Sequence, residues 1–284
     1  MTHRLILACF SLLMLIPLSA KAFPLPSPAG GNYLVLDGVD DYAVLDFKTF
    51  GVLLPKGTDE FTVEAWVYPT TLPDMDTHAM ILSQQVRMQV AVAADSWLDF
   101  KKGDLVLATQ AYTNVGRGDV KTRYRPIALS LNQWHHIAYQ AKGKETTTIV
   151  NDFVHISPRS TTLAHDLSAF EYPQDFTLGG FGRKVEFQID HLWGPFAGYI
   201  DEVRISRVAR YNVERKGFTP REKFKDDPKT VALWHFDEPS GIRKFSDASG
   251  NAHHLVGEGG ARTGIPLAVE PHEKLTTTWG RLKQ

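Results

Sequence analysis

Cysteine is nearly absent from the sequence, and the single one, Cys9, lies in an apolar run close to the first residue. Residues 1–22 carry the positive Arg4, then this apolar run, then an Ala-Lys-Ala triplet. Together these are typical of a secretory signal peptide cleaved after Ala22. We therefore expect a secreted protein, extracellular or periplasmic. The run is shorter than the roughly 20 residues that span a bilayer, which disfavours the alternative of a membrane anchor.

A chain cleaved after Ala22 has no cysteine, which excludes disulfide bonds and thiolate metal sites. A secreted domain of this kind needs a full-sized core or bound metal ions to be stable. Positive charge is not in excess either: removing Arg4 and Lys21 from the 31 basic residues leaves 29 against 32 acidic residues, a net charge of −3. Neither nucleic acid nor, after signal cleavage, a membrane is an expected partner.

A sustained helical period is also missing, and short alternating apolar runs separated by turn residues recur instead. The run Phe61–Tyr68 places Phe, Val, Ala and Val on one face and Thr, Glu, Trp and Tyr on the other. Trp134–Ala141 and Thr147–Val154 form a predicted hairpin across Lys142–Lys144. The pattern predicts an all-β, two-sheet antiparallel sandwich of about a dozen strands.

Four phrases, taken in order, carry a family resemblance. They are Asp37-Gly-Val-Asp-Asp-Tyr42, Phe61-Thr-Val-Glu-Ala-Trp-Val67, Trp134-His-His-Ile-Ala138 and Gly198-Tyr-Ile-Asp-Glu-Val-Arg-Ile205. Over residues 31–212 the chain resembles the laminin-G-like family of concanavalin A-like lectin-glucanase jelly rolls. The resemblance implies a jelly-roll sandwich, but it leaves the function open, because this fold hosts lectins, adhesion modules and glycosidases.

Composition shifts divide the rest of the chain. The expected segments are a linker over 23–30, the jelly roll over 31–212, a solvated charged connector over 213–230 and a C-terminal extension over 231–284. The extension opens on another family-like phrase, Val231–Gly241, yet it is too short for a second sandwich. We expect it to pack on the sandwich as far as about residue 257; the alternative is the stub of a lost repeat.

The Asp-Gly-x-Asp-Asp turn is the candidate for a structural Ca²⁺ site, because it offers several hard oxygen ligands within a few residues. In the wider concanavalin A-like group, one aspartate at the head of the late strand often holds such an ion, together with backbone carbonyls of the early segment. By that resemblance Asp201 is the main carboxylate, with Asp37, Gly38 and Asp40 nearby. The alternative is that these aspartates only make turns and cap backbone amides.

Catalytic acids are a second candidate feature. Catalytic relatives of this fold carry Glu-x-Asp-x-Glu or Glu-x-Asp-x-x-Glu, and neither string occurs here. Glu186 and Asp190 have the i, i+4 spacing without the central acid, so we expect no glycosidase activity. His135 and His136 are adjacent on an expected strand and point to opposite faces, which argues against joint metal ligation.

Aromatic side chains are the third candidate feature. Trp66 and Tyr68 share the polar face of a predicted strand, and Trp97 and Trp193 lie in or beside loops. Flat rings can stack on sugars, although any one Trp in a sandwich can equally be core. The leading hypothesis is a secreted, non-catalytic recognition or adhesion module that binds a polysaccharide or glycoconjugate. The alternatives are a glycan-active hydrolase and a purely structural envelope or matrix protein.

Overall fold

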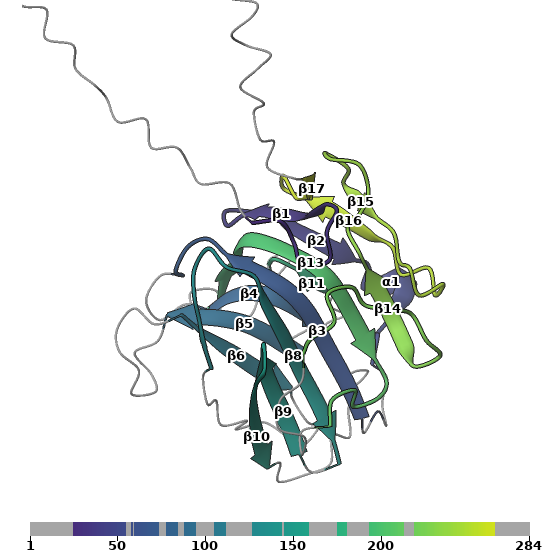
Figure 1. The fold of residues 1–284 in the computed structure, drawn as a ribbon. Coiled ribbons are helices and arrows are strands. Elements are labelled where there is room, and N and C mark those ends of the chain that lie inside the picture. The colour runs from purple at the N-terminus through teal and green to yellow at the C-terminus, as the bar shows by residue number, and fades with distance from the viewer. Residues whose placement is uncertain are drawn as a thin grey trace, which may run out of the picture.

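Two β-sheets packed face to face make up the fold, which confirms the predicted all-β sandwich (Figure 1). The computed structural model describes residues 25–54, 58, 60–73, 78–84, 88–94, 105–111, 127–143, 145–158, 175–180, 193–212 and 219–264. The expected signal peptide lies outside these residues. Pairing is antiparallel throughout except where one short strand, β12, runs parallel to β4.

The first sheet, called sheet A, has the order β10-β9-β8-β3-β13-β1-β17, with β14 also paired to β13. Its strands are β1 (Tyr33–Asp37), β3 (Glu60–Pro69), β8 (His135–Lys142), β9 (Glu145–Val150), β10 (Phe153–Pro158), β13 (Ala197–Ser206), β14 (Thr230–Trp234) and β17 (Arg262–Gly264). Along one edge, β13 pairs with β1 in its first half and with β14 in its second half. Along its other edge it pairs with β3.

The second sheet, sheet B, has the order β15-β16-β2-β11-β4-β5-β6-β7, with β12 beside β4. Its strands are β2 (Tyr42–Leu45), β4 (His78–Gln84), β5 (Met88–Ala94), β6 (Leu105–Ala111), β7 (Ile127–Leu129), β11 (Phe176–Leu178), β12 (Trp193–Pro195), β15 (Lys244–Phe245) and β16 (Leu255–Glu258). One short helix, α1 (Phe47–Phe50), begins after Asp46, whose side chain accepts a hydrogen bond from the Thr49 amide at 2.9 Å. Among the described residues, no helix is long and apolar enough to cross a membrane.

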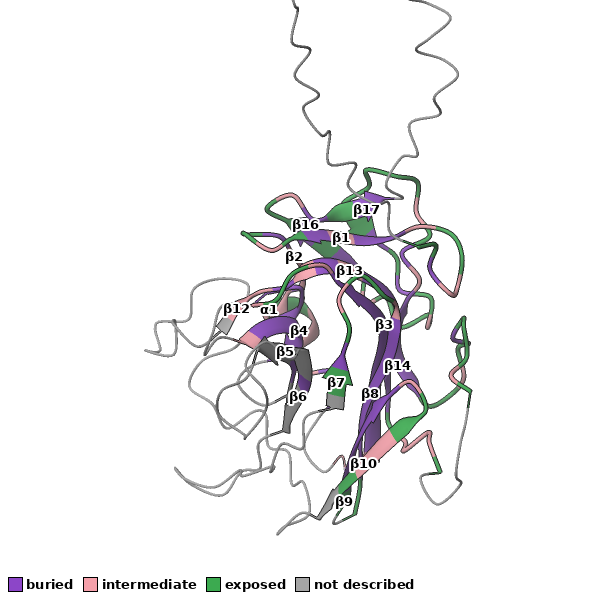
Figure 2. Cartoon of the chain, turned by 60° about the vertical axis from the view of Figure 1, so that its left-hand side comes forward, coloured by how far each residue is buried: buried purple, intermediate pink, exposed green. Residues whose placement is uncertain are grey.

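The core lies between the two sheets, which Figure 2 shows as separate layers with β3, β8 and β14 in one and β4, β5 and β6 in the other. Alternation sends Val63 and Val67 of β3 into this core. Across the layers Phe176 stacks on Trp234 with ring centroids 5.4 Å apart. Burying one large apolar side chain stabilises a fold by about 1.5–3 kcal/mol, so such contacts hold the sheets together.

The C-terminal extension supplies strands to both sheets. β14 pairs with β13 and β17 with β1 in sheet A, while β16 pairs with β2 in sheet B. Figure 1 shows these yellow-green strands beside the purple strands of the N-terminal part. Trp234, Phe236 and Phe245 are fully buried. The extension up to Gly264 is therefore part of the sandwich, and its strands complete both layers.

Over residues 219–230 the charged connector is mostly exposed, but one buried apolar side chain fixes it against the outer face of sheet A. Phe224 is 1% exposed, and its backbone amide donates to Glu202 on β13. The Arg204 guanidinium donates to the Lys225 carbonyl at 2.9 Å. The sequence did not reveal this contact, because the segment is rich in charges of both signs and a single buried apolar side chain is enough to hold it against the sheet.

Candidate functional site

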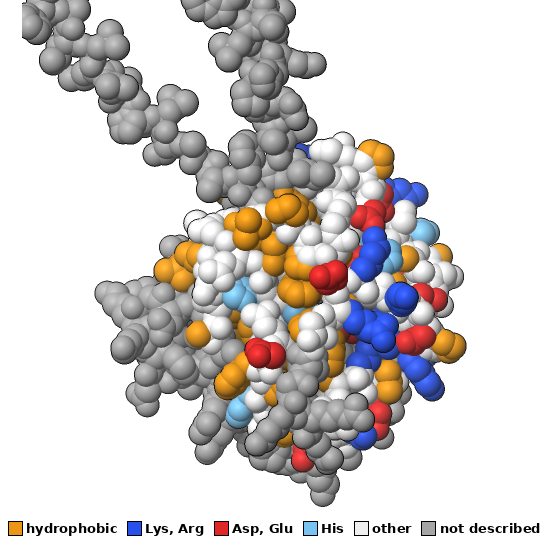
Figure 3. Space-filling model, viewed as in Figure 1, with side chains coloured by type: hydrophobic (Ala, Val, Ile, Leu, Met, Phe, Trp, Pro, Cys, Tyr) orange, Lys and Arg blue, Asp and Glu red, His pale blue; other side chains and the backbone are white. Residues whose placement is uncertain are grey.

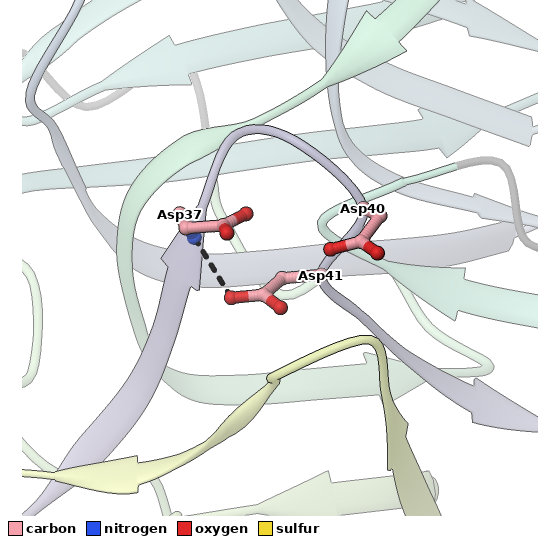
Figure 4. Close-up of side chains that lie close together, drawn as sticks. All are labelled: Asp37, Asp40 and Asp41. Carbon is pink, nitrogen blue, oxygen red and sulfur yellow. Dashed lines mark hydrogen bonds between the residues drawn. The ribbon is translucent and has the colours of Figure 1, made fainter.

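An acidic turn joins β1 to β2 and carries three aspartates (Figure 4). Carboxylate oxygens of Asp37, Asp40 and Asp41 all lie within 4.8 Å of one another, so this group could hold a metal ion. Asp37 and Asp40 are exposed and Asp41 is buried. Gly38 adopts φ +78°, and a Cβ there would come within 2.5 Å of the Ala197 side chain. Only glycine fits this tight, left-handed position.

Hydrogen bonds divide the three carboxylates into two kinds. Asp41 accepts from the Asp37 amide at 2.9 Å and from the Gly260 amide, so it fastens the turn to the connection between β16 and β17. One oxygen of Asp37 accepts from the Val39 amide at 2.7 Å. Within the described part of the chain, no group donates to the second Asp37 oxygen or to Asp40. These oxygens are the ones available to a hard cation such as Ca²⁺.

Asp201 lies apart from this turn, which corrects the single ligand set expected from the resemblance. The register pairs Leu34 with Ile200 and Asp37 with Ala197, so Asp201 falls beside the opposite end of β1. Four residues of strand separate these positions by about 13 Å. The sequence motif places both acids on neighbouring strands, but only the register of those strands decides whether they meet.

The Asp201 carboxylate is fully buried and its oxygens are occupied. It accepts hydrogen bonds from the Ser27 hydroxyl and from the Glu202 amide, the latter at 2.8 Å. Burial raises the pKa of Asp201 to about 8, and the neighbouring Glu202 charge acts in the same direction. This side chain therefore anchors residues 25–31 to sheet A.

Trp66 and Tyr68 do not present open faces, which corrects the prediction of a solvent-facing aromatic platform. Both point to the outer side of sheet A, but they are only 8% and 5% exposed. Trp66 donates its indole N–H to the Arg221 carbonyl at 3.2 Å and packs with Phe224. Sequence alternation identified the correct side of the strand, but it carried no information about the segment that covers that side.

The structure says less about the other two predicted aromatic residues, Trp97 and Trp193. Trp97 lies outside the described residues. Trp193 belongs to the short strand β12, where it pairs with His78 of β4 rather than lying in a loop; its side chain is outside the described part. Glu186 and Asp190, the spaced acids, are also outside it. Among the predicted ligands of the metal ion, all of which the structure describes, it brings together Asp37, Gly38 and Asp40 and adds Asp41.

A buried charge network, which the sequence analysis missed, lies at the far end of the outer face. Glu64 on β3 accepts from Arg204 at 2.8 Å and from the Tyr211 hydroxyl, and its carboxylate lies 3.5 Å from His136 Nε2. Burial favours the neutral form of Glu64, but the His136 hydrogen bond and the Arg204 charge outweigh it and lower its pKa. The partners are 72 to 147 residues away in sequence, so no local pattern could reveal them.

A β-bulge in β13 places two consecutive acids on the same outer face. The register shifts between Asp201 and Arg204, and Glu202 adopts φ +52°. Glu202 is fully buried and accepts from the Phe224 amide at 2.6 Å, while its other oxygen lies 2.6 Å from His235 Nδ1. Both of its oxygens therefore hold structural elements in place: the connector and the end of β14.

Comparison with known proteins agrees with this architecture. The model of the concanavalin A-like lectin/glucanases superfamily matches residues 37–213. No curated protein is significantly similar to the chain. A proposed carbohydrate binding protein from Bacteroides ovatus is 18% identical, with a TM-score of 0.53 over 83% of this chain and 60% of its own. The chain thus spans less than two thirds of that protein, and at this identity the likeness shows the fold alone.

Two further solved structures are more distant. Domain 4 of an extracellular arabinanase from Geobacillus stearothermophilus, in complex with arabinotriose, is 16% identical, with a TM-score of 0.33 over 64% of this chain and 68% of that chain. Tailspike protein 2 of Escherichia coli O157:H7 bacteriophage CAB120 is 14% identical, with a TM-score of 0.44 over 76% of this chain and 28% of that chain.

Proposed function

Because the chain belongs to the concanavalin A-like lectin/glucanases superfamily, we propose that it is a secreted recognition module that binds a polysaccharide or glycoconjugate and does not cleave it. Members of such a fold can bind or hydrolyse glycans, so the arrangement of carboxylates separates the two functions. Hydrolysis requires two carboxyl groups facing one substrate, about 5–9.5 Å apart.

The observation that carries the proposal is that the buried acids of the described chain already serve structural partners. Glu64 is paired with Arg204, Glu202 with His235, and Asp201 with Ser27. Asp247 accepts from the Leu233 and Ser249 amides. A carboxylate committed in this way cannot approach a glycosidic bond without breaking the contacts that hold the sandwich together.

The acidic turn supports a structural Ca²⁺ as part of the same proposal. Ca²⁺ takes six to eight oxygen ligands, and Asp37 and Asp40 provide carboxylate oxygens beside a glycine turn. The remaining ligands would be backbone carbonyls and water. Bound there, the ion would neutralise two neighbouring negative charges and stiffen the β1–β2 turn. We expect weak affinity, about 10⁻⁴–10⁻³ M, as in other extracellular modules.

One experiment separates binding from hydrolysis. The purified protein is applied to an array of polysaccharides, and every polysaccharide that it binds is then incubated with it and assayed for new reducing ends. Binding without release supports the proposal. Release that is lost in Asp40→Asn would instead make the exposed pair Asp37 and Asp40 catalytic, and binding to no glycan would favour a structural envelope or matrix role.

A further inference from the structure

Four aromatic rings form a continuous cluster at one end of the outer face of sheet A. Tyr68 lies directly opposite Tyr199 in the β3–β13 register, and Trp134 immediately precedes β8. Ring centroids are 5.5 Å apart for Tyr68 and Tyr199, 5.4 Å for Tyr68 and Trp134, and 4.9 Å for Tyr33 and Tyr199. Three strands of a rigid sheet therefore fix the positions of these rings.

Two rings of the cluster are buried and the other two are partly exposed to solvent. Tyr33 is 1% exposed and Tyr68 is 5% exposed, whereas Trp134 and Tyr199 are half-buried. The exposed Leu25 lies beside them, and its carbonyl accepts from the Trp134 indole N–H at 2.8 Å. Hydrophobic side chains gather near the top of the face shown in Figure 3, while Lys and Arg lie toward its right-hand side.

The Tyr33 hydroxyl is the second observation that points to a ligand. It is buried within this cluster and has no hydrogen-bond partner among the described residues. Burial is the main cause that raises the pKa of Tyr33, followed by the nearby Tyr199, Tyr68 and Asp201. The hydroxyl therefore stays protonated and keeps a donor to offer. Buried polar groups are nearly always satisfied in native proteins, so an unpaired donor among aromatic rings indicates a missing partner.

We propose that Trp134 and Tyr199 form the sugar-contacting surface of this module, and that the Tyr33 hydroxyl bonds a hydroxyl of the bound ring, directly or through water. The ligand is a neutral pyranose residue of a polysaccharide. Its apolar C–H face suits aromatic rings, and its hydroxyl groups suit tyrosine. This proposal rests on the proposed function and gives it a location.

Charges of both signs border the cluster. Asp37 follows Tyr33 and Val35 on the same side of β1, so the acidic turn borders the cluster along this strand. The cationic side chains Arg204 and Arg210 lie with Glu64 and Asp227 at the other end of the face and are already paired. The exposed Arg262 of β17 pairs with Val35 and therefore lies on the same side, beside Asp37. These opposite charges leave no positive field that would select a uronic acid polymer over a neutral one.

The test measures binding of a polysaccharide selected from the array to the full chain and four variants. Tyr199→Ala should weaken binding about tenfold, which corresponds to about 1.4 kcal/mol. Tyr33→Phe is sharper, because it removes only the unpaired hydroxyl. We expect weaker binding together with an unchanged or higher melting temperature. Trp134→Phe, which retains a ring but loses the bond to Leu25, should reduce binding less than Tyr199→Ala.

Phe153→Ala is the matched control, since Phe153 is a 59% exposed ring on β10, at the opposite edge of sheet A. It should bind as the wild type does. If the wild type binds no polysaccharide, the proposed function and this site both fall. If the wild type binds and Tyr33→Phe and Tyr199→Ala bind equally well, the function stands and the location is wrong.

Discussion

At the scale of single residues, buried polar side chains on the outer face of sheet A hold the covering segments in place. Asp201 binds the N-terminal segment through Ser27, and Glu202 binds the connector through the Phe224 amide. Glu64 joins Arg204 and Tyr211. The bulge at Glu202 breaks the alternation in β13. Glu64 alternates with core residues along β3, so the sequence predicted its side of the sheet. Its partners come from distant segments and could not be predicted.

Asp201 should make stability depend on pH. Its folded pKa of about 8 is above the ordinary 3.8, so the fold favours the neutral form. The free energy of unfolding should therefore fall as pH rises from about 4 to about 8. Asp201→Asn stays neutral and should remove this decline, whereas exposed Asp226→Asn should keep it. Urea denaturation at four pH values measures the slope; the same slope in Asp201→Asn would show that Asp201 is ionised in the fold.

Glu64 should act in the opposite sense. Its pKa is lowered in the fold, so its contribution is present above its unfolded pKa and is lost as pH falls. Glu64→Gln leaves Arg204 buried without its partner and should cost about 3–5 kcal/mol of unfolding free energy. Asp227→Asn, which breaks the more exposed pair with Arg210, should cost about 0–1 kcal/mol. Equal losses of unfolding free energy in both variants would show that burial does not make the Glu64–Arg204 pair more important for stability than the exposed pair.

At the scale of elements, alternation and turn residues located the strands well. β8 ends at Lys142 and β9 begins at Glu145, as the predicted hairpin requires. The expected strand Thr147–Val154 is divided in the structure by a turn at Asn151, which adopts φ +53°. An Asn-Asp pair is a turn signal, and the surrounding β-branched residues masked it. Pairing partners, such as β14 on β13, depend on contacts across the fold and were not predictable.

Strands β14 to β17 should be indispensable for folding. A chain that ends at Lys229 loses Trp234, Phe236 and Phe245 from the core and exposes edges in both sheets. We expect it to be insoluble or to lack a cooperative melting transition. A chain that ends at Gly264 keeps every described strand and is the reference. Cooperative melting of the shorter chain at the temperature of the reference would support the lost-repeat alternative.

The β1–β2 turn should respond to calcium. A ligand that binds only the folded state stabilises it by about 2.7 kcal/mol at a hundredfold excess over its Kd. With a Kd of about 10⁻⁴–10⁻³ M, about 10 mM Ca²⁺ is a ten- to hundredfold excess and should stabilise the fold by about 1.4–2.7 kcal/mol. The melting temperature should therefore rise, and EDTA should reverse the change. Asp40→Asn should lose the response, whereas Asp152→Asn, at an exposed turn between β9 and β10, should keep it. If neither Ca²⁺ nor EDTA changes the melting curve of the wild type, Asp37 and Asp40 form the turn but do not bind an ion.

At the scale of the whole molecule, the covering segments and the aromatic cluster lie on the same face of the sandwich, the outer side of sheet A. The N-terminal segment and the connector cover part of the outer side of sheet A, and a partly open aromatic cluster remains at its end. The sequence predicted the sandwich because its periodicity is local. It did not predict the cluster, because Tyr33, Trp134 and Tyr199 meet only through the strand order β8-β3-β13-β1.

The measurement that tests the central claim most directly is affinity electrophoresis of the full chain in gels that contain a neutral polysaccharide. We expect the wild type to be retarded and Tyr199→Ala to migrate nearly as in a gel without polysaccharide, with no shortening of the polymer after prolonged incubation. Equal, unretarded migration of the wild type in every neutral polysaccharide tested, or progressive shortening of the polymer by the wild type, would contradict a non-catalytic carbohydrate-recognition module.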